Sequence, residues 1–215
     1  MTEPRANVPR LIWRGPGDGR SVALTFDDGP HPEVTPRLLD ILEAHGAQAT
    51  FFLVGSRAAR WPRLVARIAE AGHLIGSHGY AHRGDWWRSA ATLGGDIDRA
   101  EDILGGIMPG PKLFRPPYGL LSPSWYRAAR ERGYTCVLWN VTGRDWRTAD
   151  GDRVAARLVR RARPGTLVLL HECRAETGDG YGHTLTAVEQ YLSHADARGW
   201  RMATVAACID RRRTP

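Results

Sequence analysis

The chain has 215 residues, of which 42% are hydrophobic and 25% are charged, and its formal net charge is +7. This is the composition of an ordinary globular protein, and it excludes a low-complexity chain. No apolar run approaches the roughly 18 residues that a membrane-spanning helix needs, so a transmembrane protein is also excluded.

Apolar strand-like runs alternate with segments of helical periodicity along the whole chain. In chain order the pattern predicts strand 22–26, helix 36–45, strand 49–54, helix 64–72, strand 74–76, helix 86–104, strand 112–115, helix 123–132, strand 135–139, helix 153–162, strand 166–170, helix 185–198 and strand 200–204. Glycines at 46, 72, 133 and 199 are expected to end four of these helices.

The alternation predicts parallel strands joined by right-handed crossovers, in a single α/β domain. Because polar residues follow several strands and not one pair alone, a distorted (β/α) barrel with about seven parallel strands is favoured over an open doubly wound sheet. The domain is expected at 21–207, with an N-terminal extension at 1–20 and a basic tail at 208–215.

Residues 1–10 contain no apolar core of a signal peptide. A cytoplasmic protein is therefore expected, or an extracellular or cell-wall protein if an upstream export segment has been removed. The three cysteines are an odd number, which argues against a disulfide framework. Cys173 lies two residues after His171, and a small packing residue is the favoured interpretation.

The positive charge comes almost entirely from arginines scattered along the predicted helices. The single run, Arg211–Arg213, falls in the C-terminal tail, and aromatic residues do not alternate with basic ones as they do in a base-stacking platform. Nucleic-acid binding, which would give an affinity that falls steeply with salt, is therefore disfavoured. The charge weakly favours an anionic substrate.

Five short polar blocks follow the predicted strands. They are 25–30 (TFDDGP), 78–82 (HGYAH), 115–118 (RPPY), 145–146 (DW) and the strand end 169–171 (LLH). Because the carboxyl ends of parallel strands meet on one face of a barrel, these blocks are expected to lie together. Each block alone is more often structural, but an unrelated fold has no reason to align all five.

His78 and His82 are four positions apart, so a helix or tight turn would place both imidazoles on one side. Such a pair is commonly just two surface residues, and Asp27-Asp28-Gly-Pro is also good turn chemistry. Together, two histidines and a carboxylate form a known catalytic metal set with open positions for water. A cation and an arginine would relieve the repulsion between the adjacent carboxylates, and Arg115 is the candidate.

Pro116 and Pro117 make the backbone rigid and leave Tyr118 as the next residue with a free N–H, which could stabilise an oxyanion. A structural Pro-Pro turn is the simpler alternative. His171 could act as a general acid, with Asp145 orienting it. The tryptophans that could form sugar-stacking walls are Trp86, Trp87 and Trp146, although core packing is equally expected for the first two. Five histidines have no comparable setting: His31, His45, His73, His183 and His194.

The blocks resemble, in this order, the polysaccharide deacetylase family (carbohydrate esterase family four), which includes nodulation-type chitooligosaccharide deacetylases. The resemblance runs from about Val22 to Thr204. It implies that Asp28, His78 and His82 are metal ligands. It implies the following further roles: Asp27 as catalytic base, Arg115 as its partner, Tyr118 as backbone N–H donor, His171 as catalytic acid, Asp145 as its partner, and Trp146 as pocket wall.

Two positions depart from the family pattern. The family usually has Ser or Thr after the first metal histidine, where this chain has Gly79, and this change is expected to loosen support of the ligand loop. The fourth motif usually opens with an Asp, where this chain has Thr142. Neither departure removes a metal ligand or a proton-transfer group, so activity is expected to survive.

The resemblance implies a metal-dependent enzyme that hydrolyses N-acetyl groups of amino sugars, releasing acetate and a free amine. The expected cofactor is a divalent metal, zinc by ligand type, with cobalt, nickel or manganese as alternatives. The expected partner is an N-acetylated glycan or oligosaccharide, such as chitin or peptidoglycan. Two alternatives stay open: a hydrolase of a small intracellular amide, and a non-catalytic sugar-binding module.

Overall fold

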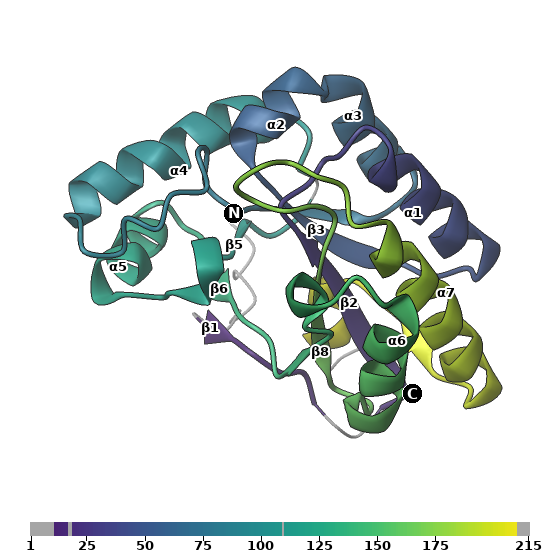
Figure 1. The fold of residues 1–215 in the computed structure, drawn as a ribbon. Coiled ribbons are helices and arrows are strands. Elements are labelled where there is room, and N and C mark those ends of the chain that lie inside the picture. Colours follow the sequence, from purple (N-terminus) through teal and green to yellow (C-terminus); the bar gives the residue numbers. More distant parts are fainter. Residues whose placement is uncertain (1–10, 17–18, 109, 210–215) are drawn as a thin grey trace.

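The chain folds around a curled parallel sheet, which a computed structural model describes for residues 11–16, 19–108 and 110–209 (Figure 1). Among these residues the sheet has nine strands, and every pairing between them is parallel. The strands are β1 (Leu11–Ile12), β2 (Ser21–Asp27), β3 (Ala49–Leu53), β4 (Leu74–Ser77), β5 (Leu113–Phe114), β6 (Thr135–Val137), β7 (Val141–Thr142), β8 (Leu167–His171) and β9 (Arg201–Met202).

The strand order is β1-β6-β5-β4-β3-β2-β8-β7, with β9 added to β2. This confirms the predicted barrel-like α/β fold. The hydrogen-bonded ladder does not close in the described part of the chain, because β1 and β7 end the path without pairing to each other. The barrel is therefore incomplete on the side where the chain passes from β6 to β7.

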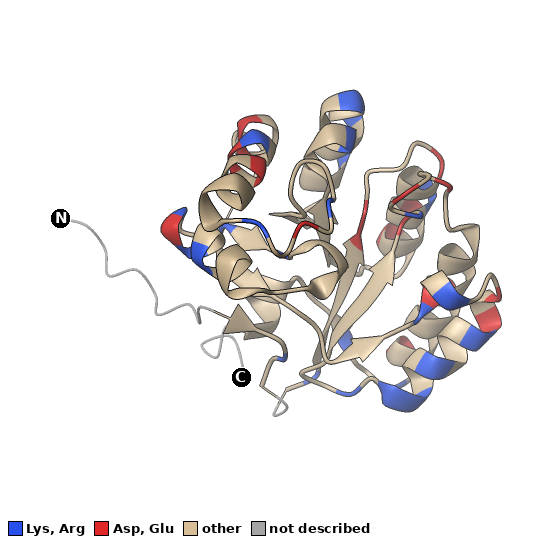
Figure 2. Cartoon of the chain, turned by 60° about the vertical axis from the view of Figure 1, so that its left-hand side comes forward, with Lys and Arg blue, Asp and Glu red and all other residues tan. Residues whose placement is uncertain are grey.

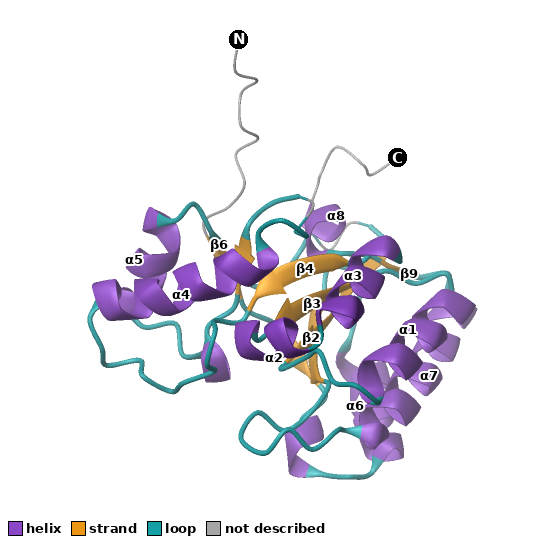
Figure 3. Cartoon of the chain, turned by 90° about the horizontal axis from the view of Figure 1, so that it is seen from above, coloured by secondary structure: helices purple, strands orange, loops and turns teal. Residues whose placement is uncertain are grey.

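Helices cover the outside of the sheet (Figure 3). The helices and 3-10 turns are α1 (Val34–Ala44), α2 (Gly55–Arg60), α3 (Pro62–Glu70), α4 (Ala90–Leu104), η1 (Pro117–Gly119), α5 (Pro123–Glu131), η2 (Asp145–Arg147), α6 (Gly151–Arg161), α7 (Gly182–Ala197) and α8 (Val205–Ile209). Basic and acidic side chains are interspersed on these outer helices, as the scattered arginines of the sequence predict (Figure 2).

Alternate residues of each strand pack on opposite faces of the sheet, as the twofold repeat of a strand requires. Phe51 and Leu53 of β3 face the large cluster under α1, α6 and α7, whereas Phe52 faces the inside of the curl. A small cluster that includes Phe52 and Val205 of α8 fills the interior. Each fully buried side chain of this size contributes about 1.5–3 kcal/mol. The interior is thus packed, and polar groups gather at the strand ends.

All seven predicted strands are present, and the six predicted helices correspond to α1, α3, α4, α5, α6 and α7. The predicted start of the third helix, at residue 86, was wrong. α4 begins at Ala90 and not near 86, because the Ser89 hydroxyl caps it by accepting from the N–H of Thr92 at 3.2 Å. Trp86 and Trp87 consequently lie in the preceding loop, 49% and 67% exposed, and do not pack in the core.

The three cysteines are unpaired and buried. No helix in the described ranges is long and apolar enough to cross a membrane. The predictions for residues 1–10 and for Arg211–Arg213 fall outside the described residues. β1 pairs with β6, so part of the predicted N-terminal extension belongs to the sheet, and α8 reaches into the predicted tail at 208–209. The domain boundaries themselves stay a prediction.

Candidate active site

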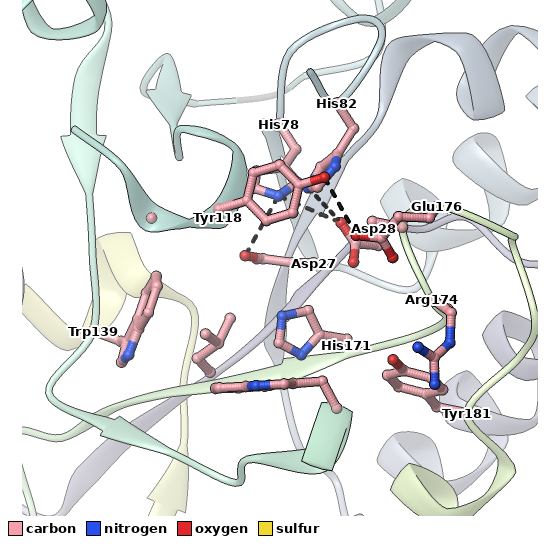
Figure 4. A pocket seen from close by; sticks show the side chains of 14 residues that line it. Asp27, Asp28, His78, His82, Tyr118, Trp139, His171, Arg174, Glu176 and Tyr181 are labelled. Atoms are coloured by element: carbon pink, nitrogen blue, oxygen red, sulfur yellow. Dashed lines mark hydrogen bonds and ion pairs between the residues drawn. The ribbon is translucent and has the colours of Figure 1, made fainter. Parts of the chain in front are cut away.

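The polar blocks meet at the carboxyl ends of the strands (Figure 4). Asp27 ends β2 and His171 ends β8, and the two are register partners in neighbouring strands. His78 directly follows β4, and the backbone N–H of Arg115, just after β5, donates to the carbonyl of Ser77 at 2.9 Å. A pocket of about 340 Å³ opens above Asp27, Asp28, His78, His82 and His171.

Asp28, His78 and His82 form a cluster whose candidate ligand atoms all lie within 4.8 Å of one another. Asp28 Oδ1 lies 3.1 Å from His82 Nε2 and 3.5 Å from His78 Nε2. The same oxygen is buried and accepts no well-aligned hydrogen bond from the described residues. A buried, unsatisfied carboxylate oxygen facing two imidazole nitrogens fits a divalent cation. The predicted ligand set is therefore brought together in space.

Hydrogen bonding and charge orient the two histidines. His78 Nδ1 lies 2.7 Å from the carbonyl of Arg115, so its Nε2 is directed to the cluster. Burial lowers the pKa of His78, but Asp27 and Asp28 outweigh burial and raise it above the usual range. For His82 burial prevails, with repulsion from His78, and the pKa falls to about 4. His82 is thus neutral near pH 7, whereas His78 would have to release its proton to bind a cation.

The loop that carries both histidines is held from outside the predicted motif. Gly79 adopts a φ of 76°, and a Cβ there would lie 2.5 Å from Asp96 Oδ2. Asp96, on α4, accepts hydrogen bonds from the backbone N–H groups of Tyr80 at 2.7 Å and Ala81 at 3.2 Å. The glycine that departs from the family pattern therefore leaves room for a carboxylate that supports the loop. Asp96 was missed because no motif contains it.

Asp27 is buried and paired with Arg115. Arg115 Nη1 donates to Asp27 Oδ1 at 2.7 Å and to the Thr25 hydroxyl at 2.7 Å, while its Nε and Nη2 donate to two backbone carbonyls at 3.2 Å. The guanidinium is fully buried, so every donation replaces lost hydration. Asp27 Oδ1 is thereby occupied, whereas Oδ2 faces the histidine cluster, 3.7 Å from His78 Nε2.

His171 is held by Asp145 from η2. The backbone N–H of His171 donates to Asp145 Oδ2 at 2.6 Å, and its Nδ1 lies 3.0 Å from Oδ1. Burial lowers the pKa of His171, but Asp145 outweighs burial and raises it to about 9. Thr184 Oγ1 also donates to Asp145 Oδ2, at 3.3 Å. The imidazole can therefore carry a proton at neutral pH, with Nε2 free.

Tyr118 lies at the rim of the pocket with a positive φ of 58°. Its backbone N–H has no backbone acceptor among the described residues, as an oxyanion donor requires. Its ring packs edge-on to His82 with centroids 4.6 Å apart, and its hydroxyl donates to Glu176 at 3.3 Å. The next residue in the chain, Gly119, has no room for a side chain, because a Cβ there would lie 2.3 Å from the Trp139 ring. The role of this N–H as an oxyanion donor stays a prediction.

A family model described as polysaccharide deacetylase matches residues 14–137, more than half of the chain. The chain belongs to the polysaccharide deacetylase family. A curated relative, a peptidoglycan-N-acetylglucosamine deacetylase of Bacillus cereus, is 35% identical over 201 residues, which cover 93% of this chain and 92% of the relative. The protein is therefore a hydrolase, as the resemblance implied. The alternative of a non-catalytic sugar-binding module is disfavoured.

Two further relatives agree with this membership. A chitooligosaccharide deacetylase of Azorhizobium caulinodans is 32% identical over 191 residues, covering 85% of this chain and 91% of the relative. The crystal structure of a peptidoglycan N-acetylglucosamine deacetylase superposes with a TM-score of 0.85 at 32% identity, over 94% of this chain and 93% of that chain. The sheet and its covering helices are therefore those of the polysaccharide deacetylases.

In this polysaccharide deacetylase a second side chain beyond the motifs ties the site together. Arg57, on α2, donates from Nη1 to the carbonyl of Asp28 and, at 2.6 Å, to Cys173 Sγ. Its Nη2 donates to the carbonyls of Arg174 at 3.1 Å and Ala175 at 2.9 Å. Arg57 thus joins the loop of Asp28 to the loop after β8, which lines the pocket. Sequence spacing gave no signal for it.

Cys173 packs in this junction. It is buried, and its Sγ donates to the carbonyl of Asp28 at 3.3 Å. Burial raises the pKa of the thiol, so the packing interpretation is favoured over a reactive one. The neighbouring Glu172 is also buried and accepts from the Thr35 hydroxyl, and burial raises its pKa to about 8.

The predicted aromatic walls are only partly present. Trp146 lines the pocket, edge-on to the His171 ring with centroids 5.3 Å apart. Trp86 and Trp87 do not line it. Trp139 does, although the sequence suggested only a strand residue. His183, which had no evident setting, lies 3.0 Å from the Asp145 carbonyl through Nε2 and supports η2.

Proposed function

We propose that this polysaccharide deacetylase removes the acetyl group from N-acetylglucosamine units of a glycan or oligosaccharide, yielding acetate and a free amine. The observation that carries the proposal is the pairing of Asp27 and His171 as register neighbours on β2 and β8, beside the Asp28, His78 and His82 cluster. The residues proposed as proton acceptor, proton donor and cation ligands thus border one pocket. The relatives named above act on peptidoglycan and chitooligosaccharide, which supports this substrate class.

Asp28, His78 and His82 would hold a divalent metal, with zinc first on ligand type and cobalt, nickel or manganese as alternatives. When bound, the cation would supply a Lewis acid that polarises a carbonyl and lowers the pKa of a water. The remaining chemistry falls to the side chains of the chain itself.

Asp27 is the proposed general base. Arg115 holds one of its oxygens at 2.7 Å, so the other accepts a proton from the attacking water. The water oxygen forms a bond to the acetyl carbon, and the backbone N–H of Tyr118 donates to the oxyanion that develops. Removal of one such donor typically costs about 3 kcal/mol of barrier.

His171 is the proposed general acid. Its Nδ1 is held by Asp145 at 3.0 Å, so the proton on Nε2 can pass to the amide nitrogen as the carbon–nitrogen bond breaks. The leaving group departs as a neutral amine and the acetyl group as acetate. A general acid or base of this kind contributes roughly a hundred- to ten-thousand-fold in rate.

Acetate release tests the proposal. The protein is loaded with zinc and incubated with chitin oligomers, peptidoglycan fragments and small N-acetylglucosamine conjugates, with the Asp27→Asn variant as blank. We expect release from one of the first two classes, abolished by chelation and restored by added metal. Release from the small conjugates alone would replace the proposed substrate class, and no release from any of the three would refute the function.

A further inference from the structure

A second cavity, of about 450 Å³, lies beside the active-site pocket. Its lining includes Arg14, Trp139, Asn140, Arg157, Arg161 and Arg163, and we call it the arginine cavity. It occupies the side on which the barrel is incomplete, between the end of β6 and the start of β8. Trp139 lines both this cavity and the active-site pocket, so the two are neighbours.

The charge of the arginine cavity is uncompensated. Four arginines line it, and no aspartate or glutamate of the described ranges does. None of these four guanidinium groups forms an ion pair with a described residue. Burial, followed by repulsion from Arg144, Arg161 and Arg160, lowers the pKa of Arg157. Arg14, Arg161 and Arg163 are exposed and Arg157 is half-buried, so the cavity is an open basic surface that attracts anions.

Several hydrogen-bond donors of the cavity also have no acceptor among the described residues. Arg157 uses only Nε, which donates to the Thr142 carbonyl at 2.8 Å and so holds the side chain in place. Its two Nη groups have no acceptor among the described residues, and Nη2 of Arg163 has none either. A guanidinium fork with both Nη groups free matches a carboxylate, which accepts two parallel hydrogen bonds.

We propose that the arginine cavity binds a carboxylate of the same glycan strand whose N-acetyl group enters the active-site pocket. This inference rests on the proposed function and narrows its substrate class to an anionic N-acetylated glycan, such as peptidoglycan, whose strands bear carboxylates. Figure 4 shows Trp139 on the side of the pocket opposite Arg174, and the same residue lines the arginine cavity. An aromatic ring between two polar sites suits a sugar face.

The test compares two substrates of equal sugar number, a neutral N-acetylglucosamine oligomer and a carboxylate-bearing peptidoglycan fragment. The variant is Arg157→Gln/Arg161→Gln. The matched control is Arg153→Gln on the same helix, because Arg153 is 80% exposed and pairs with Asp150 outside the cavity. We expect kcat/KM for the anionic fragment to fall about tenfold through KM in the double variant. The neutral oligomer and the control variant should be unaffected.

Loss on both substrates, or on neither, would overturn the inference. Equilibrium binding of the anionic fragment, measured by calorimetry on the wild type and the double variant, separates it from the proposed function. Binding that depends on the two arginines, without acetate release, would refute the proposed function and support the carboxylate site. Acetate release with binding that is the same in wild type and double variant would refute the carboxylate site and support the proposed function. Thermal unfolding of the double variant checks that the fold is intact.

Discussion

Asp145 contacts His171 through both carboxylate oxygens, one on the backbone N–H at 2.6 Å and one on the ring Nδ1 at 3.0 Å. The first contact ties η2 to the end of β8, and the second holds the imidazole with Nε2 toward the pocket. One side chain therefore sets both the position and the protonation of the proposed acid. Its removal should be visible in the pH dependence of turnover.

Asp145→Asn should move the alkaline limit of activity to lower pH. The pKa of His171 is raised from 6.5 to about 9, chiefly by Asp145 acting against burial. The imidazole therefore donates a proton below this pKa and loses that ability as the pH rises through it. A bound cation would add positive charge and lower the pKa of His171. The alkaline limb of the wild-type pH profile is therefore expected between about pH 6.5 and 9.

The measurement is kcat against pH for wild type and Asp145→Asn with the same substrate. Without the Asp145 carboxylate, burial lowers the pKa of His171 against only the weaker effects of Asp27 and Asp28, so the alkaline limb should fall below that of the wild type. An unchanged limb would contradict the assignment of His171 as the acid. Thr184→Val, which removes only the 3.3 Å contact to Asp145, serves as the control and should shift the limb less.

His171→Ala and Asp27→Asn should lower kcat by roughly a hundred- to ten-thousand-fold each, since each removes one proton-transfer group. Neither side chain belongs to the cluster of Asp28, His78 and His82, so metal content should not change. Metal analysis of the purified variants beside kcat measurement checks this. Near-normal rates with full metal content would show that the roles are misassigned.

His82→Ala should lose the metal. The substitution removes one of three candidate ligands and leaves the buried Asp28 Oδ1 with His78 alone. Equilibrium dialysis against zinc measures the stoichiometry. The control is His45→Ala, because His45 pairs with Asp196 far from this cluster. Full zinc retention in the His82 variant would contradict the ligand set.

Asp96→Ala should weaken metal binding without removing a ligand. The carboxylate holds the N–H groups of Tyr80 and Ala81, and supporting groups of this kind are typically worth about 10- to 100-fold in metal affinity. Zinc affinity of the apoprotein, by competition with a chelating dye, measures the effect. Asp102→Ala on the same helix is exposed and should bind zinc as the wild type does.

Arg57→Ala should raise KM and destabilise the pocket. Arg57 is shared between the Asp28 carbonyl and the loop carbonyls at 174 and 175. Its removal leaves the Ala175 carbonyl without a donor among the described residues, whereas the Asp28 and Arg174 carbonyls keep the Cys173 thiol and the Gly178 N–H. We expect a loss of about 1–3 kcal/mol in the free energy of unfolding. Denaturant titration and steady-state kinetics measure both effects, with Arg60→Ala on the same helix as control. Equal stability of the two variants would contradict this role for Arg57.

Much of the fold was predictable because long apolar runs of β2, β3 and β8 are buried on both faces, and such runs are easily recognised. β1 and β7, of two residues each, were not predicted. The predicted start of α4 near Trp86 was too early, because the capping hydroxyl of Ser89 marks the true beginning.

The sequence by itself determined which side chains meet at the site, because Asp27, His78, Arg115 and His171 each end or directly follow a strand, and parallel strands end on one face. Only the tertiary structure decided what holds them. Asp96 and Arg57 act from α4 and α2, whose packing against the loops no local pattern specifies. The arginine cavity likewise exists because the strand ladder stays open beside Trp139, and closure depends on pairing between strands distant in the chain.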